Sequence, residues 1–381
     1  MSSYISNNLG LTNESLLKIF AYIIDCDIAD TLELQNLGLA SISSIPELYS
    51  SLIYYYFKKM YNEKTLICSY LDYTNKELNY IAGDINIAES ISRGSLGNGL
   101  VCQNVTQLSY NTEINNVIDY CLCICVNKFI SKTKRYINDI INLYKTVFRH
   151  DFKNQPLKVE VILKNLHIIE NYLNGDFSYS YKEYHNILTI CKLFLESLYY
   201  SLENNDFKGI TDDRLIQYIM ENFSRTLVRR VMRRLAKEYN FVGKYHIWSD
   251  DLKIYKDDLY PDLVLDILIK FDKSVNLPDI IIDVKTNKFL TKGSKYEHSD
   301  NINQIYRYVN KYSKTKKKNV VGALLHYVSD KHKESAIKFN NTIIDTDPDI
   351  FMSVFTIEGV LDIKLVEFFV LNLLKRLLLL E

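Results

Sequence analysis

The chain has 381 residues, and its 46 Lys and Arg residues balance its 46 Asp and Glu residues, so the formal net charge is zero. Hydrophobic residues make up 47% and charged residues 24%, which excludes intrinsic disorder and is typical of a soluble globular protein. The length predicts two domains. Because the chain has no net positive charge, nucleic-acid binding would require local basic patches.

The seven cysteines lack the paired spacing of a zinc site or a secreted disulfide framework, which favours a reducing cytoplasm. Cys121, Cys123 and Cys125 lie in an apolar helical stretch where alternate side chains diverge, so we expect buried small residues and not metal ligands. The start, MSSYISNN, has no secretory signal, and Lys375 and Arg376 interrupt the C-terminal apolar run. We therefore expect no membrane segment.

The first half of the chain alternates between helical and strand-like patterns. Leu16, Leu17, Phe20, Ile23 and Ile24 are spaced for one buried helical face. The expected elements are helices at 12–62, a β-rich region at 65–108 that contains the loop SRGSLGNG, and an antiparallel pair of long helices at 112–148 and 158–203. Arg93 in that loop is a candidate for reaching a partner protein, and a plain hairpin connection is the alternative.

The polar segment NNDFKGITDD at 204–213 is the best candidate for a domain boundary. After it the pattern predicts a mixed central sheet with helices, an α/β arrangement. We therefore divide the chain into an N-terminal mixed β and helical adaptor domain, 1–205, and a C-terminal domain, 206–381. The expected C-terminal elements are a helix at 213–240, strands at 244–248, 261–270 and 279–285, a helix at 299–313, strands at 319–328 and 351–357, and a final helix.

One constellation in the C-terminal half carries chemistry. Tyr260-Pro261-Asp262 is followed, after a strand and a turn, by the hydrophobic strand that ends in Asp283, Val284 and Lys285. Because alternate residues of a strand share a face, Asp283 and Lys285 project together. A neighbouring strand would bring Asp262 within reach of Asp283. These two carboxylates and the carbonyl oxygen of Val284 suit a hard cation such as Mg²⁺, with Mn²⁺ as a substitute.

Phosphodiester hydrolysis requires a water that is nucleophilic near neutral pH and stabilisation of the charge that develops on the phosphorus, and a divalent ion supplies both. Lys285 would orient the water or neutralise the scissile phosphate. We expect it to stay cationic beside two carboxylates, because opposite charges favour its protonated form. The constellation predicts a metal-dependent phosphodiester hydrolase.

The PD and DVK strings at the ends of successive strands resemble the PD-(D/E)XK nuclease superfamily, which implies a restriction-endonuclease-like fold. Glu221, in the helix before the strands, is similar to an acidic position of that superfamily. Gln304 and Tyr308 give QxxxY on one helical face, similar to RecB-like members, which implies that both support the site. For these last two residues a structural cap is the alternative.

The segments IAGDINIAESI and LVCQNVTQLSYNTEINNVI resemble the McrC family in its strand pattern and its NTxxN helix start. That resemblance implies the nuclease subunit of a modification-dependent restriction system that recognises methylated cytosine and acts with McrB, a hexameric AAA+ GTPase, whose hydrolysis it stimulates. The chain has no GxxxxGK[ST] phosphate-binding loop, so the GTPase would be another polypeptide. The alternatives are an autonomous nuclease of restriction or repair, and a non-catalytic GTPase-activating scaffold.

Basic residues supply candidate DNA contacts. Arg225, Arg229 and Arg233 recur every four residues and would form a stripe that follows DNA phosphates, with a solvated face as the alternative. Tyr308 joins them as a predicted DNA contact. The run at 316–318 is interpreted as a soluble turn. We assign none of the histidines as a ligand.

Overall fold

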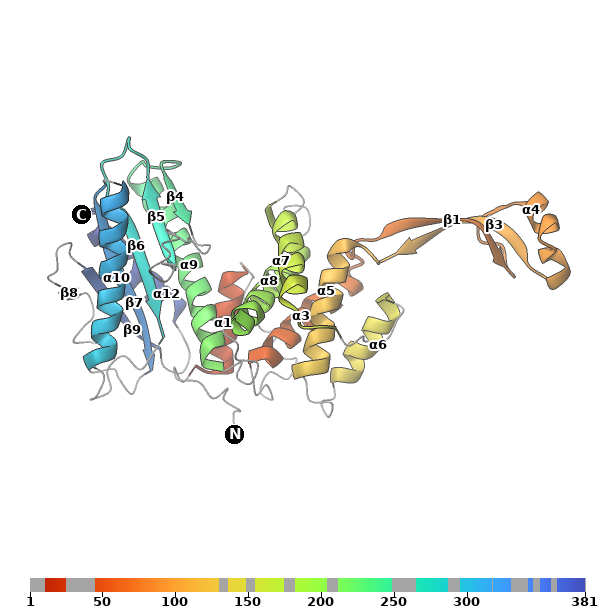
Figure 1. The fold of residues 1–381 in the computed structure, drawn as a ribbon, viewed down its shortest axis with the longest axis horizontal. Coiled ribbons are helices and arrows are strands. Elements are labelled where there is room, and N and C mark those ends of the chain that lie inside the picture. The colour runs from red at the N-terminus through yellow and green to blue at the C-terminus, as the bar shows by residue number, and fades with distance from the viewer. Residues whose placement is uncertain are drawn as a thin grey trace. The chain divides into compact units, whose positions relative to one another are not determined.

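The chain, seen in a computed structural model, forms two compact units (Figure 1). One unit comprises Met1–Leu48 with Asn204–Glu381, and the other comprises Tyr49–Glu203. The expected boundary at residue 205 thus lies next to the start of the second segment, whereas the first 48 residues group with the C-terminal segment. The structure describes residues 11–24, 45–129, 136–148, 155–174, 182–203, 212–248, 265–286, 295–316, 318–329, 342–344, 350–357 and 362–380.

The unit that contains the C-terminal segment is built on a six-stranded mixed sheet of order β4-β5-β6-β7-β9-β8. The central pairs β6–β7 and β7–β9 are parallel, and the outer pairs β4–β5, β5–β6 and β8–β9 are antiparallel. The expectation of a mixed central sheet in this half is confirmed. The strands are β4 (Tyr245–Trp248), β5 (Ile267–Phe271), β6 (Asp279–Lys285), β7 (Val320–Ser329), β8 (Thr342–Ile344) and β9 (Ile350–Ile357).

Helices cover both faces of this sheet. Helix α10 (Lys295–Lys316) joins β6 to β7 and packs on one face, where Gly322 of β7 lets it approach: a Cβ there would lie 2.8 Å from Val309 Cγ2. Helix α9 (Asp212–Glu238) packs on the other face, where Ser224 Oγ lies 2.8 Å from the hydroxyl oxygen of Tyr327. Gly322 and Tyr327 point to opposite faces because they differ by an odd number of residues.

Two further helices complete this unit. Helix α1 (Asn13–Ile23) begins at Thr12, whose side chain accepts a hydrogen bond from the backbone N–H of Ser15, and it packs against α9. Helix α12 (Ile363–Leu377) is capped by Asp362 and packs against α9 and β9. The C-terminal apolar run is therefore a packed helix, as expected. Within the described part of the chain, no helix is both long enough and apolar enough to span a bilayer.

The other unit contains an antiparallel ribbon of β1 (Ser69–Leu78) and β3 (Val101–Ser109), which ends where Leu78 pairs with Val101 (Figure 1). At that end β2 (Asp84–Ile85) joins β3, and the connection contains helix α4 (Ile87–Ser92) and a 3-10 helix at Ser95–Asn98. The segment expected to be a loop is therefore mostly helical. We call residues 79–100, with their strand ends, the ribbon tip.

Buried polar side chains organise the ribbon tip. Gln103 is fully buried, its Oε1 accepts hydrogen bonds from the N–H groups of Ala82 and Gly83, and its Nε2 donates to the carbonyl of Tyr80. Gly83 lies so close to β3 that a Cβ would clash with the Asn104 carbonyl. These contacts fix a short segment without a hydrophobic core of its own.

Helices form the rest of this unit. The expected pair of long helices is wrong in detail, because the sequence at 112–148 and 158–203 is divided among shorter helices. These are α5 (Glu113–Ile124) with a π-helical turn (Cys125–Phe129), α6 (Tyr136–Phe148), α7 (Val159–Asn174) and α8 (Lys182–Glu203), which pack with α3 (Ile45–Asn62) around buried aromatic residues.

The NTxxN string has a clear structural role at the start of α5. Thr112 accepts a hydrogen bond from the N–H of Asn115 and so caps the helix. The buried side chain of Asn115 donates to the carbonyl of Ile67 and accepts from the hydroxyl of Tyr184. The motif therefore ties the base of the ribbon to α5 and α8.

Candidate active site

The candidate site lies at the C-terminal end of β6. Asp283 and Lys285 point to the α10 face of the sheet, because their register partners Leu324 and His326 lie on the same face as Gly322. Lys285 Nζ lies 3.1 Å from Oδ1 and 2.9 Å from Oδ2 of Asp283. The Asp283 side chain is 3% exposed and that of Lys285 is 18% exposed, so this is a largely dehydrated ion pair.

Asp266, which the sequence interpretation missed, supplies a second carboxylate. It directly precedes β5, and because Ile267 pairs with Ile282, the antiparallel register brings residue 266 opposite residue 283. Its Oδ2 accepts a hydrogen bond of 2.6 Å from the N–H of Val284. The signal that could have found it is its position directly before the buried run ILIKF. Asp262, the expected partner of Asp283, lies outside the described residues and stays a prediction.

Helix α9 contributes Glu221, the predicted acidic residue, together with Gln217, which was not predicted. Gln217 Nε2 donates to Glu221 Oε1 at 2.7 Å and to the carbonyl oxygen of Val284 at 2.9 Å. Its Oε1 accepts from the hydroxyl of Thr286. One amide therefore connects the predicted acidic residue of α9 to the predicted carbonyl ligand of β6.

Helix α10 contributes the predicted Gln304 and Tyr308. Gln304 Nε2 donates to the Tyr308 hydroxyl at 2.6 Å, so the two lie on one helical face as the i, i+4 spacing predicted. Tyr308 is buried, and its pKa is raised by burial first and then by the charge of Asp283. Tyr308 is also one of the groups that raise the pKa of Lys285. The face of α10 that carries Gln304 and Tyr308 therefore lies near the ion pair.

Burial and mutual repulsion change the protonation of the carboxylates. Burial, followed by the charge of Asp266, raises the pKa of Asp283 to about 7, although Lys285 opposes this shift. Burial, followed again by Asp266, raises the pKa of Glu221 to about 8. Burial alone would lower the pKa of Lys285, but Asp283 and then Asp266 raise it above its ordinary value. Lys285 is therefore cationic at neutral pH, as expected.

The donor set fits a hard divalent cation. Asp283 Oδ2 is buried, and apart from its 2.9 Å ion pair with Lys285 Nζ it forms no hydrogen bond, so it keeps acceptor capacity that a divalent cation could use. The carboxylate of Asp266 and the Val284 carbonyl add oxygen donors beside it. Across the described ranges, no cluster of three or more His, Cys, Asp or Glu side chains is arranged to hold a metal, so the fit depends on backbone oxygen as well as carboxylates.

The three predicted DNA-contacting arginines lie in different environments. Arg225 is half-buried, and its Nε donates to the carbonyl of Asp266 at 3.0 Å, so it points into the site. Its charge also lowers the pKa of Glu221. Arg229 and Arg233 are exposed. Contact with DNA remains a prediction for all three and for Tyr308.

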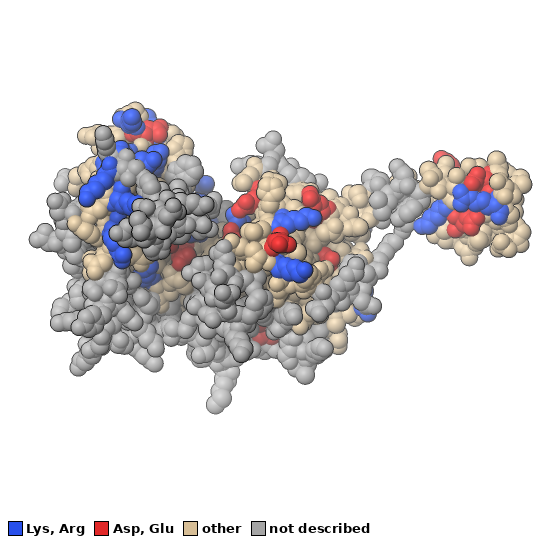
Figure 2. All heavy atoms as spheres, in the orientation of Figure 1, with Lys and Arg blue, Asp and Glu red and all other residues tan. Residues whose placement is uncertain are grey.

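Basic residues gather on this unit despite the zero net charge, and Figure 2 shows a band of Lys and Arg side chains on the face that it draws. Helix α10 contributes exposed Arg307 and Lys314, which the sequence interpretation did not single out, and exposed Lys316 from the run at 316–318. Lys318 differs from the expected soluble turn: its Nζ lies 2.5 Å from Oδ1 of buried Asp279. It is an anchor at the start of β6.

Other sequence predictions have simpler outcomes. Cys121, Cys123 and Cys125 are buried free thiols, as expected of small core residues. Arg93 forms an ion pair of 2.6 Å with Glu89 on α4. Its side chain remains 45% exposed, so the ribbon tip still presents it to solvent.

Comparisons with known proteins give a structural likeness without a match in sequence. No protein-family model matches the chain, and no curated protein matches its sequence. Among solved structures, the chain is similar to one in the refined half-complex from the tetradecameric assembly of Thermococcus gammatolerans McrB AAA+ hexamers with bound McrC. The sequence identity is 14%, the TM-score is 0.47, and the match covers 95% of this chain and 76% of that chain.

Proposed function

We propose that the chain is a Mg²⁺-dependent DNA endonuclease subunit of a modification-dependent restriction system, in which an McrB-like AAA+ GTPase controls cleavage and is stimulated in return. The observation that carries the nuclease part is the buried pair of Asp283 and Lys285 at the end of β6, with Asp266 beside it and one carboxylate oxygen left without a hydrogen bond. Burying charged groups costs free energy. A buried ion pair at the end of a strand is therefore a candidate functional site.

Each residue has a role in this proposal. Asp283, Asp266 and the Val284 carbonyl would hold the metal, with Asp262 as a further predicted ligand. When bound, the ion would make a water nucleophilic near neutral pH and neutralise developing negative charge. Lys285, cationic because of its two acidic neighbours, donates hydrogen bonds to the water or to the scissile phosphate and is not a general base.

Glu221 and Gln217 support the site from α9. The raised pKa of Glu221 gives this carboxyl a proton at neutral pH in the metal-free chain, and loss of that proton on metal binding would add negative charge near the ion. Gln217 holds Glu221 and the Val284 carbonyl in fixed positions through its amide. Gln304 and Tyr308, joined by their hydrogen bond, flank Lys285 from α10.

The partner component rests on the resemblance of the ribbon segments to McrC and on the surface of the ribbon tip. Six large hydrophobic side chains are exposed there, whereas soluble surfaces normally scatter such residues singly. They are Tyr80 (62%), Ile81 (74%), Ile85 (44%), Ile87 (63%), Ile91 (65%) and Leu96 (50%). We assign the ribbon tip to contact with the GTPase.

The test compares the isolated chain with the chain plus an McrB-like GTPase, on methylated and unmethylated plasmid DNA with Mg²⁺ and GTP. The proposal expects cleavage only when metal, GTP and partner are all present, and faster GTP hydrolysis when the chain is added. Cleavage by the isolated chain would favour an autonomous nuclease. Stimulated GTP hydrolysis with neither cleavage nor divalent-ion binding would favour a scaffold and overturn the nuclease assignment.

A further inference from the structure

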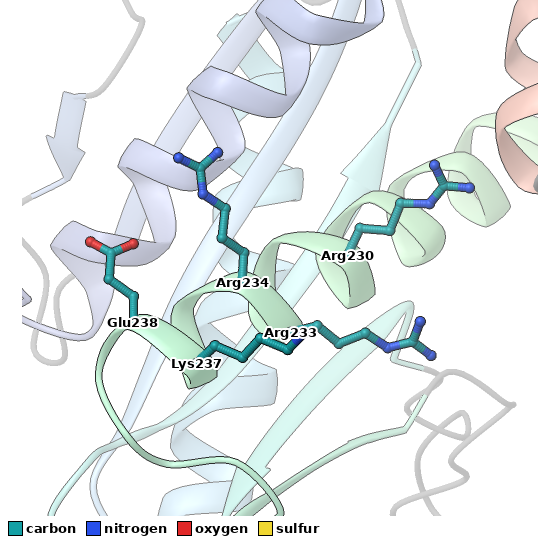
Figure 3. A pocket seen from close by; sticks show the side chains of 5 residues that line it. All are labelled: Arg230, Arg233, Arg234, Lys237 and Glu238. Carbon is teal, nitrogen blue, oxygen red and sulfur yellow. The ribbon is translucent and has the colours of Figure 1, made fainter.

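The C-terminal half of α9 presents a cationic surface outside the candidate active site. An open hollow of 610 Å³ is lined there by one acidic and four basic residues, and their side chains project from successive turns of the helix (Figure 3). The lining residues are Arg230, Arg233, Arg234, Lys237 and Glu238. Four like charges close together repel one another. An anionic ligand or a neighbouring carboxylate would reduce that repulsion.

Two lining residues already have partners. Arg230 donates from Nη2 to the carbonyl of Tyr22 at 2.8 Å, and its guanidinium lies 3.9 Å from the centroid of the Tyr22 ring. Glu238 lies 2.8 Å from Lys375 Nζ. The one carboxylate of the hollow therefore pairs with a residue of α12 and also feels the charge of Arg234, and Arg230 is used in packing against α1.

Three cations remain, Arg233, Arg234 and Lys237. All three are exposed, and within the described ranges none of them forms an ion pair within 4.0 Å of a carboxylate. The helix dipole favours a cation only in the last turn, which accounts for Lys237 but not for the arginines one turn earlier. Arg233 and Lys237 also repel each other at i, i+4 spacing, so the cluster is unfavourable in the free chain.

The distance of this cluster from the candidate site indicates which anion fits. Arg233 and Lys237 lie 12 and 16 positions after Glu221 on the same helix, which corresponds to about 18–24 Å at ~1.5 Å per residue. Because an α-helix turns about 100° per residue, Arg233, Arg234 and Lys237 lie roughly 120–160° around α9 from Glu221. The cluster therefore faces away from the candidate site, and an extended polyanion such as DNA would contact it at phosphates other than the scissile one.

We propose that Arg233, Arg234 and Lys237 bind the DNA backbone at phosphates other than the scissile one. This inference rests on the proposed function, because it takes DNA as the substrate. The three side chains provide only positive charge and hydrogen-bond donors. We therefore expect them to bind phosphates and not to distinguish bases. It therefore positions the duplex without selecting a sequence.

The test measures DNA affinity in the full chain with the Asp283→Ala change, so that binding is separated from cleavage. A triple variant, Arg233→Gln, Arg234→Gln and Lys237→Gln, is compared by fluorescence anisotropy across a salt series, after thermal unfolding has verified its fold. We expect affinity to fall about tenfold or more and the slope of log K against log salt to decrease by about two to three. A matched control neutralises three exposed lysines of the other unit, Lys58, Lys158 and Lys164.

The outcomes separate the inference from the proposed function. Equal affinity and salt slope for the triple variant and its parent overturn the inference alone, as does an equal loss in the control. A parent chain that binds no DNA overturns both.

Discussion

Gln217 and Val284 are 67 residues apart in the sequence, and the side-chain amide of Gln217 donates a 2.9 Å hydrogen bond to the backbone carbonyl of Val284. The same nitrogen lies 2.7 Å from Glu221 Oε1. A helix on one face of the sheet is thereby connected to the strand that carries Asp283 and Lys285. The position of the Val284 carbonyl is therefore set by α9 as well as by the sheet.

Gln217→Ala should weaken divalent-ion binding, because the Val284 carbonyl and Glu221 lose the group that orients them. Loss of such a supporting contact costs about 10- to 100-fold in metal affinity or activity. Isothermal titration with Mn²⁺ measures this directly. Asn222→Ala is the matched control, since among the described residues that amide donates to the carbonyl of Tyr218 on its own helix. Unchanged Mn²⁺ affinity in the Gln217 variant would remove its role as a positioning residue.

Asp266 should be as important for cleavage as Asp283, because both act on the same buried cluster. We expect Asp266→Ala to reduce cleavage to background while thermal unfolding stays cooperative. Exposed Asp272→Ala is the control. Asp262→Ala separates two arrangements: full activity in that variant would assign the second carboxylate to Asp266 alone. Wild-type cleavage by Asp266→Ala would exclude this residue from the site.

Metal binding should be linked to pH because the carboxylates hold protons in the free chain. The pKa of Asp283 is raised to about 7 and that of Glu221 to about 8, so Asp283 must lose its proton to bind a cation, and the added positive charge would favour proton loss from Glu221. Mn²⁺ affinity should rise from pH 6 to pH 8 with release of protons. Titration in two buffers of different ionisation enthalpy detects that release. Equal affinity at the two pH values would contradict the assignment.

The same burial predicts a stability gain in Asp283→Asn. A carboxyl whose pKa is higher in the folded chain lowers stability as pH rises from its unfolded value near 3.9 to its folded value, because the unfolded chain releases the proton first. Removing the carboxyl should therefore stabilise the chain by about 1–3 kcal/mol at pH 8 and by less at pH 5, after the lost Lys285 pair is subtracted. Urea unfolding at both pH values measures this, with Asp272→Asn as control. A net loss of stability at pH 8 would show that the ion pair outweighs burial.

The ribbon tip provides a prediction about the partner. Ile87→Asp with Ile91→Asp should abolish stimulation of the GTPase, because charged groups cannot enter an apolar contact without losing hydration. Both side chains are more than 60% exposed, so the fold should persist. Val242→Asp, at a side chain 65% exposed on the other unit, is the control. Full stimulation by the double variant would assign the partner contact elsewhere.

Local patterns were sufficient to predict β6 and its chemistry. The hydrophobic run before Asp283 ends at Lys285 in the structure as in the sequence interpretation, because alternation and burial act within one strand. The i, i+4 relation of Gln304 and Tyr308 was predictable for the same reason. The mixed sheet followed from the order of elements.

Contacts that depend on register were not predictable. Asp266 was missed because the strand was expected to begin at 261, whereas β5 begins at Ile267 and only its pairing with β6 brings Asp266 opposite Asp283. Gln217 was missed because its contacts with Val284 and Thr286 depend on how α9 packs against β6, although its i, i+4 spacing from Glu221 was visible in the sequence. Lys318 was interpreted as a soluble turn because its buried partner, Asp279, is remote in sequence.

Cleavage of modified plasmid DNA by the full chain, with Mg²⁺, GTP and the GTPase partner, tests the central claim most directly. The account predicts that Asp283→Ala and Lys285→Ala each abolish cutting while partner assembly and stimulated GTP hydrolysis persist, and that the controls Asp272→Ala and Lys273→Ala cut like the wild type. Retained cleavage by purified Asp283→Ala or Lys285→Ala would contradict the assignment of the active site to the end of β6.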